Sequence, residues 1–441
     1  MVADASVPAT HRERSWLDRS LSIFTEVRAG EGTTAVLMTT NIFLLLFCYS
    51  VIKTVREPLI LLGGGAEVRS YAAAGQAVLL MGFVPFYGWL ASRVSRMNLI
   101  VGVTLIFVVC IELFAGAVAA AWPYVGVVFY IWVGIFSISL IAQFWSFAND
   151  IYSKEAGDRL FPLITLGMTA GAPVGPLLAG RMFGEGTPPQ VILQISAVLL
   201  LATLAPYLVI NAREIRRVTR PPNALTSASG FALVLRNPYL RLIAVLIMVL
   251  NVVNTTGEYL IGRLVTAQAV TLRQADPSFD PQAYIGAFFG EYQFWVSVAA
   301  LLLQALVASR LVRHAGLSGA LLALPIVALG AYSIMALGVG FAIVRWAKTA
   351  ENATDYSIMN TARQLMWLPT SRDEKYKAKQ AVDTFFVRIG DVVSAGVVLV
   401  GTTWLALDVR GFALANVALT VAWIALATRI LRRYPEVAKE A

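Results

Sequence analysis

Long apolar segments, separated by short polar ones, recur along the whole chain. Runs of roughly 18 to 24 apolar residues are long enough to cross a bilayer core of about 30 Å as helices. We expect twelve membrane-spanning helices, and eleven is the alternative because the tenth run is the least hydrophobic. The expected spans cover residues 33–62, 70–91, 99–121, 124–147, 160–180, 190–210, 239–261, 284–308, 319–338, 341–363, 382–404 and 411–431.

Composition supports this interpretation. Of the 441 residues, 58% are hydrophobic and only 14% are charged, and the mean hydropathy is +0.70. A soluble domain usually has about 25% charged residues. We therefore expect an all-α integral membrane protein that has the lipid bilayer as its surroundings.

The basic side chains are distributed unevenly between the two sets of expected loops. With the N-terminus inside, the inner loops and both termini carry about 23 Lys and Arg residues and the outer loops about 6, which is the positive-inside asymmetry. We expect a multi-pass protein of the inner membrane with both termini cytoplasmic. The sequence pI of about 9.6 then reflects topology, so nucleic acid is not an expected partner.

Side chains for metal or nucleophilic chemistry are scarce. Cys48 and Cys110 lie in apolar runs, and His11 and His314 lie in expected cytoplasmic segments without partners. Their spacing fits neither a disulfide framework nor a metal site. We expect no cofactor, no metal and no enzymatic activity.

The two halves of the sequence repeat each other. "LASRVSRMNLI" (90–100) matches "VASRLVRHAGL" (307–317), and "SVIKTVREPLI" (50–60) matches "NVVNTTGEYLI" (251–261), so that Glu57 corresponds to Glu258. Two six-helix repeats are the design of major facilitator transporters. The expected divisions are a cytoplasmic N-terminal segment 1–32, a six-helix half 33–210, a cytoplasmic linker 211–237, a second half 238–434 and a cytoplasmic tail 435–441.

Within the N-terminal segment, "SWLDRSLSIFTEV" alternates apolar and charged residues. It is either an interfacial helix or a disordered tail. The segment is too polar, and the first apolar run too long, for a signal peptide.

The segment between the second and third spans resembles the major facilitator signature. In "GWLASRVSRM" (88–97), Gly88, Leu90, Arg93 and Arg96 match it, whereas its aspartate is replaced by Ser92. Arg93 and its repeat equivalent Arg310 are either cytoplasmic anchors or parts of a cytoplasmic gate.

The first span contains an unusual polar cluster. "CYSVIKTVREPLILLGGG" (48–65) places Lys53, Arg56, Glu57 and Pro58 within an otherwise apolar run. Lys53 either reaches the outer interface along its aliphatic stem or faces a cavity near the midplane, where a charge needs a partner or water. The repeat favours the cavity, because its counterpart carries Asn251, Asn254 and Glu258 inside the seventh span.

A second polar stripe follows the tenth span. At 100° per residue, its members fall within about 80° of one another, and such a stripe cannot face lipid. It either lines a transport pathway or forms a buried ion-pair network. More cations than carboxylates around a central cavity would favour an anionic substrate, because Arg and Lys both bind phosphate and carboxylate oxygens. The stripe comprises Arg345, Lys348, Asn352, Asp355, Met359 and Arg363.

Three longer segments resemble the ATP/ADP translocase family of plastids and intracellular bacteria, and more closely its relatives in free-living bacteria. They are "YSVIKTVREPLIL", "AQFWSFANDIYSKEAGDRLFPLITLG" (142–167) and "SRDEKYKAKQAVDTFFVRIGD" (371–391), within a resemblance that covers roughly 27–434. The resemblance implies a twelve-span nucleotide transporter in which Lys53 is the required lysine. Two glutamates of the family pattern fall at Val133 and Asn254.

Together these features predict a membrane carrier that moves a small anionic, nucleotide-like phosphorylated solute, such as ATP or ADP, by alternating access. A proton-coupled carrier of another organic anion and a non-transporting membrane module are the alternatives, and the oligomeric state is open. Expected substrate-binding residues are Lys53, Arg56, Asn254, Arg345, Lys348, Asn352 and Arg363. Expected coupling or gating residues are Glu57, Glu258, Asp355, Arg93 and Arg310.

Overall fold

The computed structural model describes residues 15–23, 25–214, 230–371 and 374–440, and this part of the chain is helical without a strand. The first half contains seven helices: α1 (Trp16–Leu21), α2 (Gly32–Ala91), α3 (Arg96–Ala119), α4 (Val125–Ile151), α5 (Lys154–Gly184), α6 (Pro189–Ala202) and α7 (Leu204–Glu214).

The second half begins with α8 (Gly230–Arg236), α9 (Pro238–Ala275), α10 (Pro281–Leu302), the π-helical turn η1 (Leu303–Ala308) and α11 (Ser309–Ala336). It continues with α12 (Phe341–Thr354), η2 (Asp355–Met359), α13 (Asn360–Met366), η3 (Glu374–Ala378), α14 (Lys379–Ala381), η4 (Val382–Phe386), α15 (Val387–Thr403) and α16 (Val409–Glu440).

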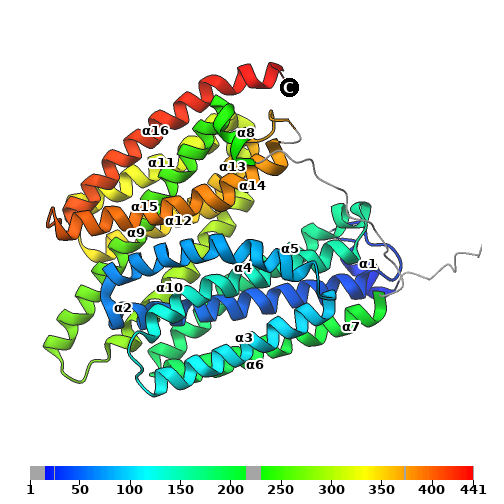
Figure 1. Ribbon diagram of the computed structural model, residues 1–441, viewed down its shortest axis with the longest axis horizontal. Coiled ribbons are helices and arrows are strands. Elements are labelled where there is room, and N and C mark those ends of the chain that lie inside the picture. The colour runs from blue at the N-terminus through cyan, green and yellow to red at the C-terminus, as the bar shows by residue number, and fades with distance from the viewer. Residues whose placement is uncertain (1–14, 24, 215–229, 372–373, 441) are drawn as a thin grey trace, which may run out of the picture.

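Nine helices of the described residues are long and apolar enough to cross a membrane, and two of them are hairpins. A straight helix of 60 residues would be about 90 Å long, but α2 folds back on itself at Gly65 (Figure 1). Gly65 has φ 77°, and Gly316 breaks the continuous stretch 281–336 with φ 57°. Both angles lie in the left-handed region that glycine adopts most easily.

The segment from α12 to α13 is the tenth expected span, and its charges keep it out of that set of nine. When each of the two hairpins is counted as two spans and this segment is added, the structure has the twelve expected spans. Two helices, α9 and α16, extend beyond the ends expected from the sequence. Residues 262–275 were expected in a loop, but α9 continues because Val265 and Ala269, four residues apart, pack into the core. Likewise, α16 extends to Glu440.

A ladder of glycines joins α2 to α5. Gly167, Gly171 and Gly175 lie on one face of α5, because residues four apart stack along a helix. A Cβ on each would lie 2.2 to 2.6 Å from a backbone oxygen of Thr39, Phe43 or Phe47. The absence of side chains lets the two backbones approach closely, as small residues do between membrane helices.

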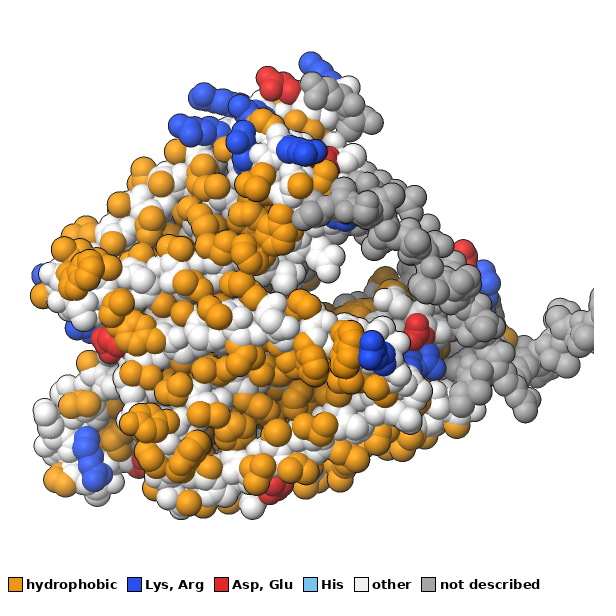
Figure 2. Space-filling model, viewed as in Figure 1, with side chains coloured by type: hydrophobic (Ala, Val, Ile, Leu, Met, Phe, Trp, Pro, Cys, Tyr) orange, Lys and Arg blue, Asp and Glu red, His pale blue; other side chains and the backbone are white. Residues whose placement is uncertain are grey.

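The two halves touch at one end and diverge at the other. Figure 1 shows α2 to α7 in one bundle and α11 to α16 in a second, with the gap widening toward the C-terminus and α1. Figure 2 shows that the surface is hollowed between the bundles on this side. At the opposite end, the core of the second half includes Ile60, Leu61 and Ala66 of the α2 hairpin, so the halves are sealed there.

Candidate functional site

A cavity of about 740 Å³ lies between the two halves. Tyr49, Ser50 and Lys53 reach it from the first arm of α2, Gln293 and Ser297 reach it from α10, and Tyr356 reaches it from η2. Threonine side chains of α5 and Gln304 of η1 complete its polar lining. Hydroxyl and amide groups from both halves therefore surround a lysine, which is the arrangement expected of a ligand site rather than of a packed core.

Lys53 is the cation of this cavity. Its Nζ lies 3.3 Å from Oε1 of Gln293, across the boundary between the halves. No carboxylate of the described residues lies within ion-pair distance of Lys53, whereas the other cations near the centre of the molecule are paired. Among the two interpretations of its position, the geometry favours the one in which Lys53 faces a cavity.

Arg56 and Glu57, one turn further along α2, are buried in a different place. Glu57 accepts hydrogen bonds from Arg56 and, at 2.8 Å, from Arg69 of the second arm. Arg69 also reaches Glu258 of α9, with 3.3 Å between NH2 and Oε2. The guanidinium of Arg56 lies 4.2 Å from the ring centre of Tyr130. Arg56 is thus packed beside the seal between the halves and does not line the cavity.

The two repeat-related glutamates therefore share one arginine. Glu57 and Glu258, which the internal alignment makes equivalent, lie on either side of Arg69. A shared cation lowers the repulsion between two buried carboxylates. This arrangement joins the two halves at the sealed end of the molecule.

Lys348 anchors the corresponding network of the second half. Its Nζ lies 2.6 Å from Glu351, 3.1 Å from Oδ1 of Asn254 and 4.0 Å from Glu258. Asn352 donates to Glu258 at 2.7 Å. The Asn352 amide also donates to Tyr292 at 2.8 Å. Lys348 is fully buried, so these contacts, and not solvent, balance its charge.

The remaining stripe residues of the tenth span are also paired. Arg345 lies 2.9 Å from Glu291, and Arg363 lies 3.6 Å from Asp355. Met359 is buried in the apolar core of the second half. The π-helical turn at Asp355–Met359 holds one more residue per turn than an α-helix, so the stripe is rotated at this point.

Pairing reduces the expected surplus of cations to one. The six cations of the region are Lys53, Arg56, Arg69, Arg345, Lys348 and Arg363, and their five carboxylates are Glu57, Glu258, Glu291, Glu351 and Asp355. Arg345, Lys348 and Arg363 were expected to supply the excess positive charge. Carboxylates on neighbouring turns and helices neutralise them, and of these six cations Lys53 is the one without a carboxylate partner among the described residues.

The two expected gate arginines do not meet in this structure. Arg93 stacks on Trp89, with 4.4 Å between its guanidinium carbon and the ring centre, and Arg310 donates to the carbonyl of Leu306. Each contacts only its own helix end. Because the halves diverge on this side, an interaction across them would require the other conformation of the carrier.

Tryptophans do not line the cavity. Trp145 packs against Phe144 and Phe161, Trp346 packs against Trp295, and Trp367 is buried in the second core. Tyr49 and Tyr356 are the aromatic side chains at the cavity.

Several residues of the site were not found from the sequence. Arg69 lies next to a run of glycines in an expected outer turn, and nothing in the local pattern indicates that the hairpin returns it to Glu57. Gln293 and Tyr356 were not among the expected site residues, although both line the cavity. Glu351 is not a member of the expected stripe, although Lys348 contacts it directly.

Comparison with known proteins gives an independent result. The model of the TLC ATP/ADP transporter family matches residues 12–119, which include Lys53 and Arg69. The ADP,ATP carrier protein 1 of Chlamydia muridarum is 23% identical over an alignment of 474 positions, covering 88% of this chain and 87% of the relative. The carrier of the same name from Chlamydia pneumoniae is 22% identical, with 79% and 81% covered. The resemblance inferred from the sequence is confirmed.

Solved structures of transporters have the same fold. A bacterial homologue of the iron transporter ferroportin in its inward-facing state gives a TM-score of 0.61 at 15% identity, covering 91% of this chain and 98% of that one. A peptide transporter of the POT family in complex with sulfate gives 0.63 at 14% identity, covering 96% and 99%. By sequence, residues 12–119 thus resemble the TLC ATP/ADP transporter family, and the helical fold of the chain is like that of solved membrane transporters.

Proposed function

We propose that this protein carries nucleotides or similar phosphorylated anions across the inner membrane, and that Lys53 binds the phosphate groups. The observation that carries the proposal is the position of Lys53 in a cavity of about 740 Å³ without a carboxylate partner among the described residues. An unpaired ammonium in a cavity between membrane helices is costly. A polyphosphate would offset that cost and would gain charge-assisted hydrogen bonds.

The rest of the lining suits the other parts of a nucleotide. Tyr49 and Tyr356 offer ring faces, and aromatic rings stack on flat apolar groups such as a base. Ser50, Ser297 and Gln293 offer hydrogen bonds for a sugar. These residues come from both halves, so a bound solute would contact both halves at once.

The contacts between the halves support a mechanism of alternating access. The cavity is closed at one end by the Glu57–Arg69–Glu258 bridge, and the halves diverge at the other end. Breaking that bridge while Arg93 and Arg310 approach one another would expose Lys53 to the opposite side. The relatives named ADP,ATP carriers make exchange of one nucleotide for another the expected mode.

The inner-membrane location and the cytoplasmic position of both termini belong to the same proposal. They rest on the uneven distribution of Lys and Arg between the loops. A green fluorescent protein fused after Ala441 would fluoresce if the C-terminus is cytoplasmic. A periplasmic alkaline phosphatase fused at the same position would then be inactive.

Uptake of radiolabelled ATP and ADP into proteoliposomes tests the proposal. We expect Lys53→Gln to abolish uptake and counterflow without a change in expression or melting temperature, because the carbonyl and amide of glutamine cannot neutralise a phosphate. Lys53→Arg keeps the charge and should retain part of the activity. Arg273→Gln, at the exposed end of α9, serves as the control for charge removal.

Two results would contradict the proposal. Normal nucleotide transport by Lys53→Gln would show that the cation of the cavity is structural. Uptake that requires a pH gradient, and that is equal for an organic anion without phosphate, would favour the proton-coupled alternative.

A further inference from the structure

A second pocket, separate from the cavity at Lys53, lies on the outside of the second half. It has a volume of about 510 Å³ and is lined by the start of α9 and the end of α16. Both helix ends lie at the side of the molecule where the halves diverge (Figure 1), which the loop charges predict to be cytoplasmic. Its lining residues are Pro238, Arg241, Leu242, Val245, Leu426, Arg429, Arg432 and Arg433.

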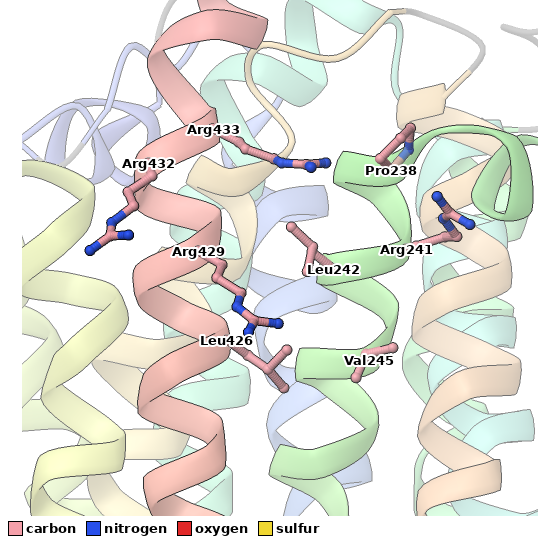
Figure 3. Close-up of a pocket in the computed structure, with 8 residues that line it drawn as sticks. All are labelled: Pro238, Arg241, Leu242, Val245, Leu426, Arg429, Arg432 and Arg433. Carbon is pink, nitrogen blue, oxygen red and sulfur yellow. The ribbon is translucent and has the colours of Figure 1, made fainter.

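The pocket combines positive charge with apolar side chains. Figure 3 shows Arg429 and Arg433 of α16 pointing across the space toward α9, with Leu242 and Leu426 also between the two helices. Arg241 flanks the pocket on α9, and Arg432 is turned to the opposite side of α16. Cationic side chains next to apolar ones match a ligand that has an anionic head and a hydrocarbon tail.

None of the four guanidinium groups forms an ion pair or hydrogen bond with a residue that the structure describes. This distinguishes them from the arginines between the halves, of which Arg56, Arg69, Arg345 and Arg363 all have carboxylate partners. Arg429 and Arg433 point into the same space, so their like charges repel each other, and an anion between them would relieve that repulsion.

We propose that this pocket binds the headgroup of an anionic phospholipid from the cytoplasmic leaflet. The arginines lie at the ends of expected spans, where lipid phosphates are expected, and a guanidinium matches a phosphate with two parallel hydrogen bonds. Basic pockets between membrane helices on this side suit such headgroups. The acyl chains would lie against Leu242, Val245 and Leu426.

The competing explanation is that the arginines only anchor the helix ends, as basic residues do on the inner side of a membrane. Anchoring requires no particular arrangement, so any two arginines of that side would be equivalent. A lipid site instead requires Arg429 and Arg433, which share one pocket. The two explanations therefore predict different results for matched pairs of substitutions.

The test measures lipid binding to the purified full-length protein in detergent. Short-chain dihexanoyl phosphatidylglycerol, the neutral dihexanoyl phosphatidylcholine and inorganic phosphate are titrated separately, and binding is followed by thermal shift and by native mass spectrometry. We expect phosphatidylglycerol to bind about tenfold more tightly than phosphatidylcholine. Arg429→Gln/Arg433→Gln should abolish this preference.

The control variant is Arg19→Gln/Arg213→Gln, which removes two exposed arginines from α1 and α7 on the same expected face. It should keep the preference for the anionic lipid. Leu242→Gln, which leaves all four arginines in place, should weaken phosphatidylglycerol binding and leave any phosphate binding unchanged. This single substitution keeps the test informative if the double arginine variant fails to fold.

Two outcomes would overturn the proposal. If the pocket variant and the control variant lose the lipid preference to the same extent, the arginines act only as general positive charge. If inorganic phosphate saturates the pocket as readily as phosphatidylglycerol, the site binds free anions and not lipid. Neither outcome bears on nucleotide transport through the cavity at Lys53.

Discussion

At the scale of single residues, the buried charges of this protein divide into two groups. Lys53 faces a cavity and has only an amide partner, whereas Arg69 and Lys348 are enclosed by carboxylates. When one partner of a buried ion pair is removed, the other charge is left uncompensated and the fold is destabilised. A buried charge without a carboxylate partner is free to bind a ligand.

Arg69 provides a test of the first group. Arg69→Ala leaves Glu57 and Glu258 without their shared cation, and we expect a loss of about 3 to 5 kcal/mol in stability. Thermal unfolding in detergent, followed by tryptophan fluorescence, measures it. Arg69→Gln/Glu258→Gln should be less harmful than Arg69→Ala, because it removes a carboxylate together with the guanidinium and leaves Arg56 paired with Glu57. Equal melting temperatures for Arg69→Ala and the wild type would show that the bridge does not stabilise this conformation.

At the scale of elements, close contacts between helices depend on glycines, which have no side chain. Gly180 of α5 and Gly290 of α10 face each other across the boundary between the halves. A Cβ on Gly290 would lie 2.4 Å from the Cα of Gly180, which is backbone and cannot turn aside. Helix α10 therefore packs directly on the other half at this point.

Gly290→Ala should force α5 and α10 apart. We expect a destabilisation of about 1 to 3 kcal/mol, as for other overpacked contacts, and slower nucleotide transport. Gly184→Ala is the matched control, because it lies one turn from Gly180 on α5 and its Cβ would meet nothing within 4 Å. Equal melting temperatures for the two variants would show that the contact between Gly180 and Gly290 does not require a glycine at position 290.

The short helix α1 is fixed by one carboxylate. Asp18 accepts hydrogen bonds from the backbone of Ser15, Gly30 and Gly32, so it joins the cap of α1 to the first turn of α2. Burial acts to raise the pKa of this carboxyl, but these hydrogen bonds together lower it below its ordinary value of 3.8. The ionised form is therefore the one that the folded segment favours.

This lowered pKa predicts a pH dependence. Stabilisation of the segment is fully present above pH 3.8 and is lost as the pH falls through the lower folded value. We expect Asp18→Asn to speed hydrogen exchange in residues 15–32 at neutral pH, because one accepting oxygen becomes a donor. Arg19→Gln, an exposed neighbour, should leave exchange unchanged. Slow exchange in Asp18→Asn would show that the segment is held by other contacts.

At the scale of the whole molecule, the structure is open on one side only. The seal between the halves and the hollow of Figure 2 lie at opposite ends of the cavity. We therefore expect water and solutes to reach Lys53 from the side where the two halves diverge. This asymmetry also explains why Arg93 and Arg310 lie apart here.

Cysteine labelling can test this asymmetry. In a background with Cys48→Ser and Cys110→Ala, we expect Gln304→Cys in the cavity to react with an impermeant thiol reagent from the cytoplasmic side only. Nucleotide should protect it. Trp404→Cys, in the exposed turn after α15, is the control and should react only from the opposite side. Labelling of Gln304→Cys from both sides in the absence of nucleotide would mean that the seal is not maintained.

The apolar pattern and the internal repeat predicted twelve spans and a fold of two repeats, and the polar cluster of the first span made Lys53 a candidate site residue. Those properties depend on local composition and on internal similarity: an apolar run must cross the bilayer as a helix because its backbone has no other hydrogen-bond partners there. The equivalence of Glu57 and Glu258 also came from the sequence, although their common partner did not.

Which cations have carboxylate partners became clear only from the packing of the helices against one another. Arg345, Lys348 and Arg363 form one stripe in the sequence, yet Glu291, Glu351 and Asp355 neutralise them, and Arg69 reaches Glu57 because α2 turns back at Gly65. Periodicity shows the face of a helix on which a residue lies but not what the neighbouring helix places opposite it. In a low-dielectric interior, that neighbour determines whether a cation binds a ligand or is paired within the protein.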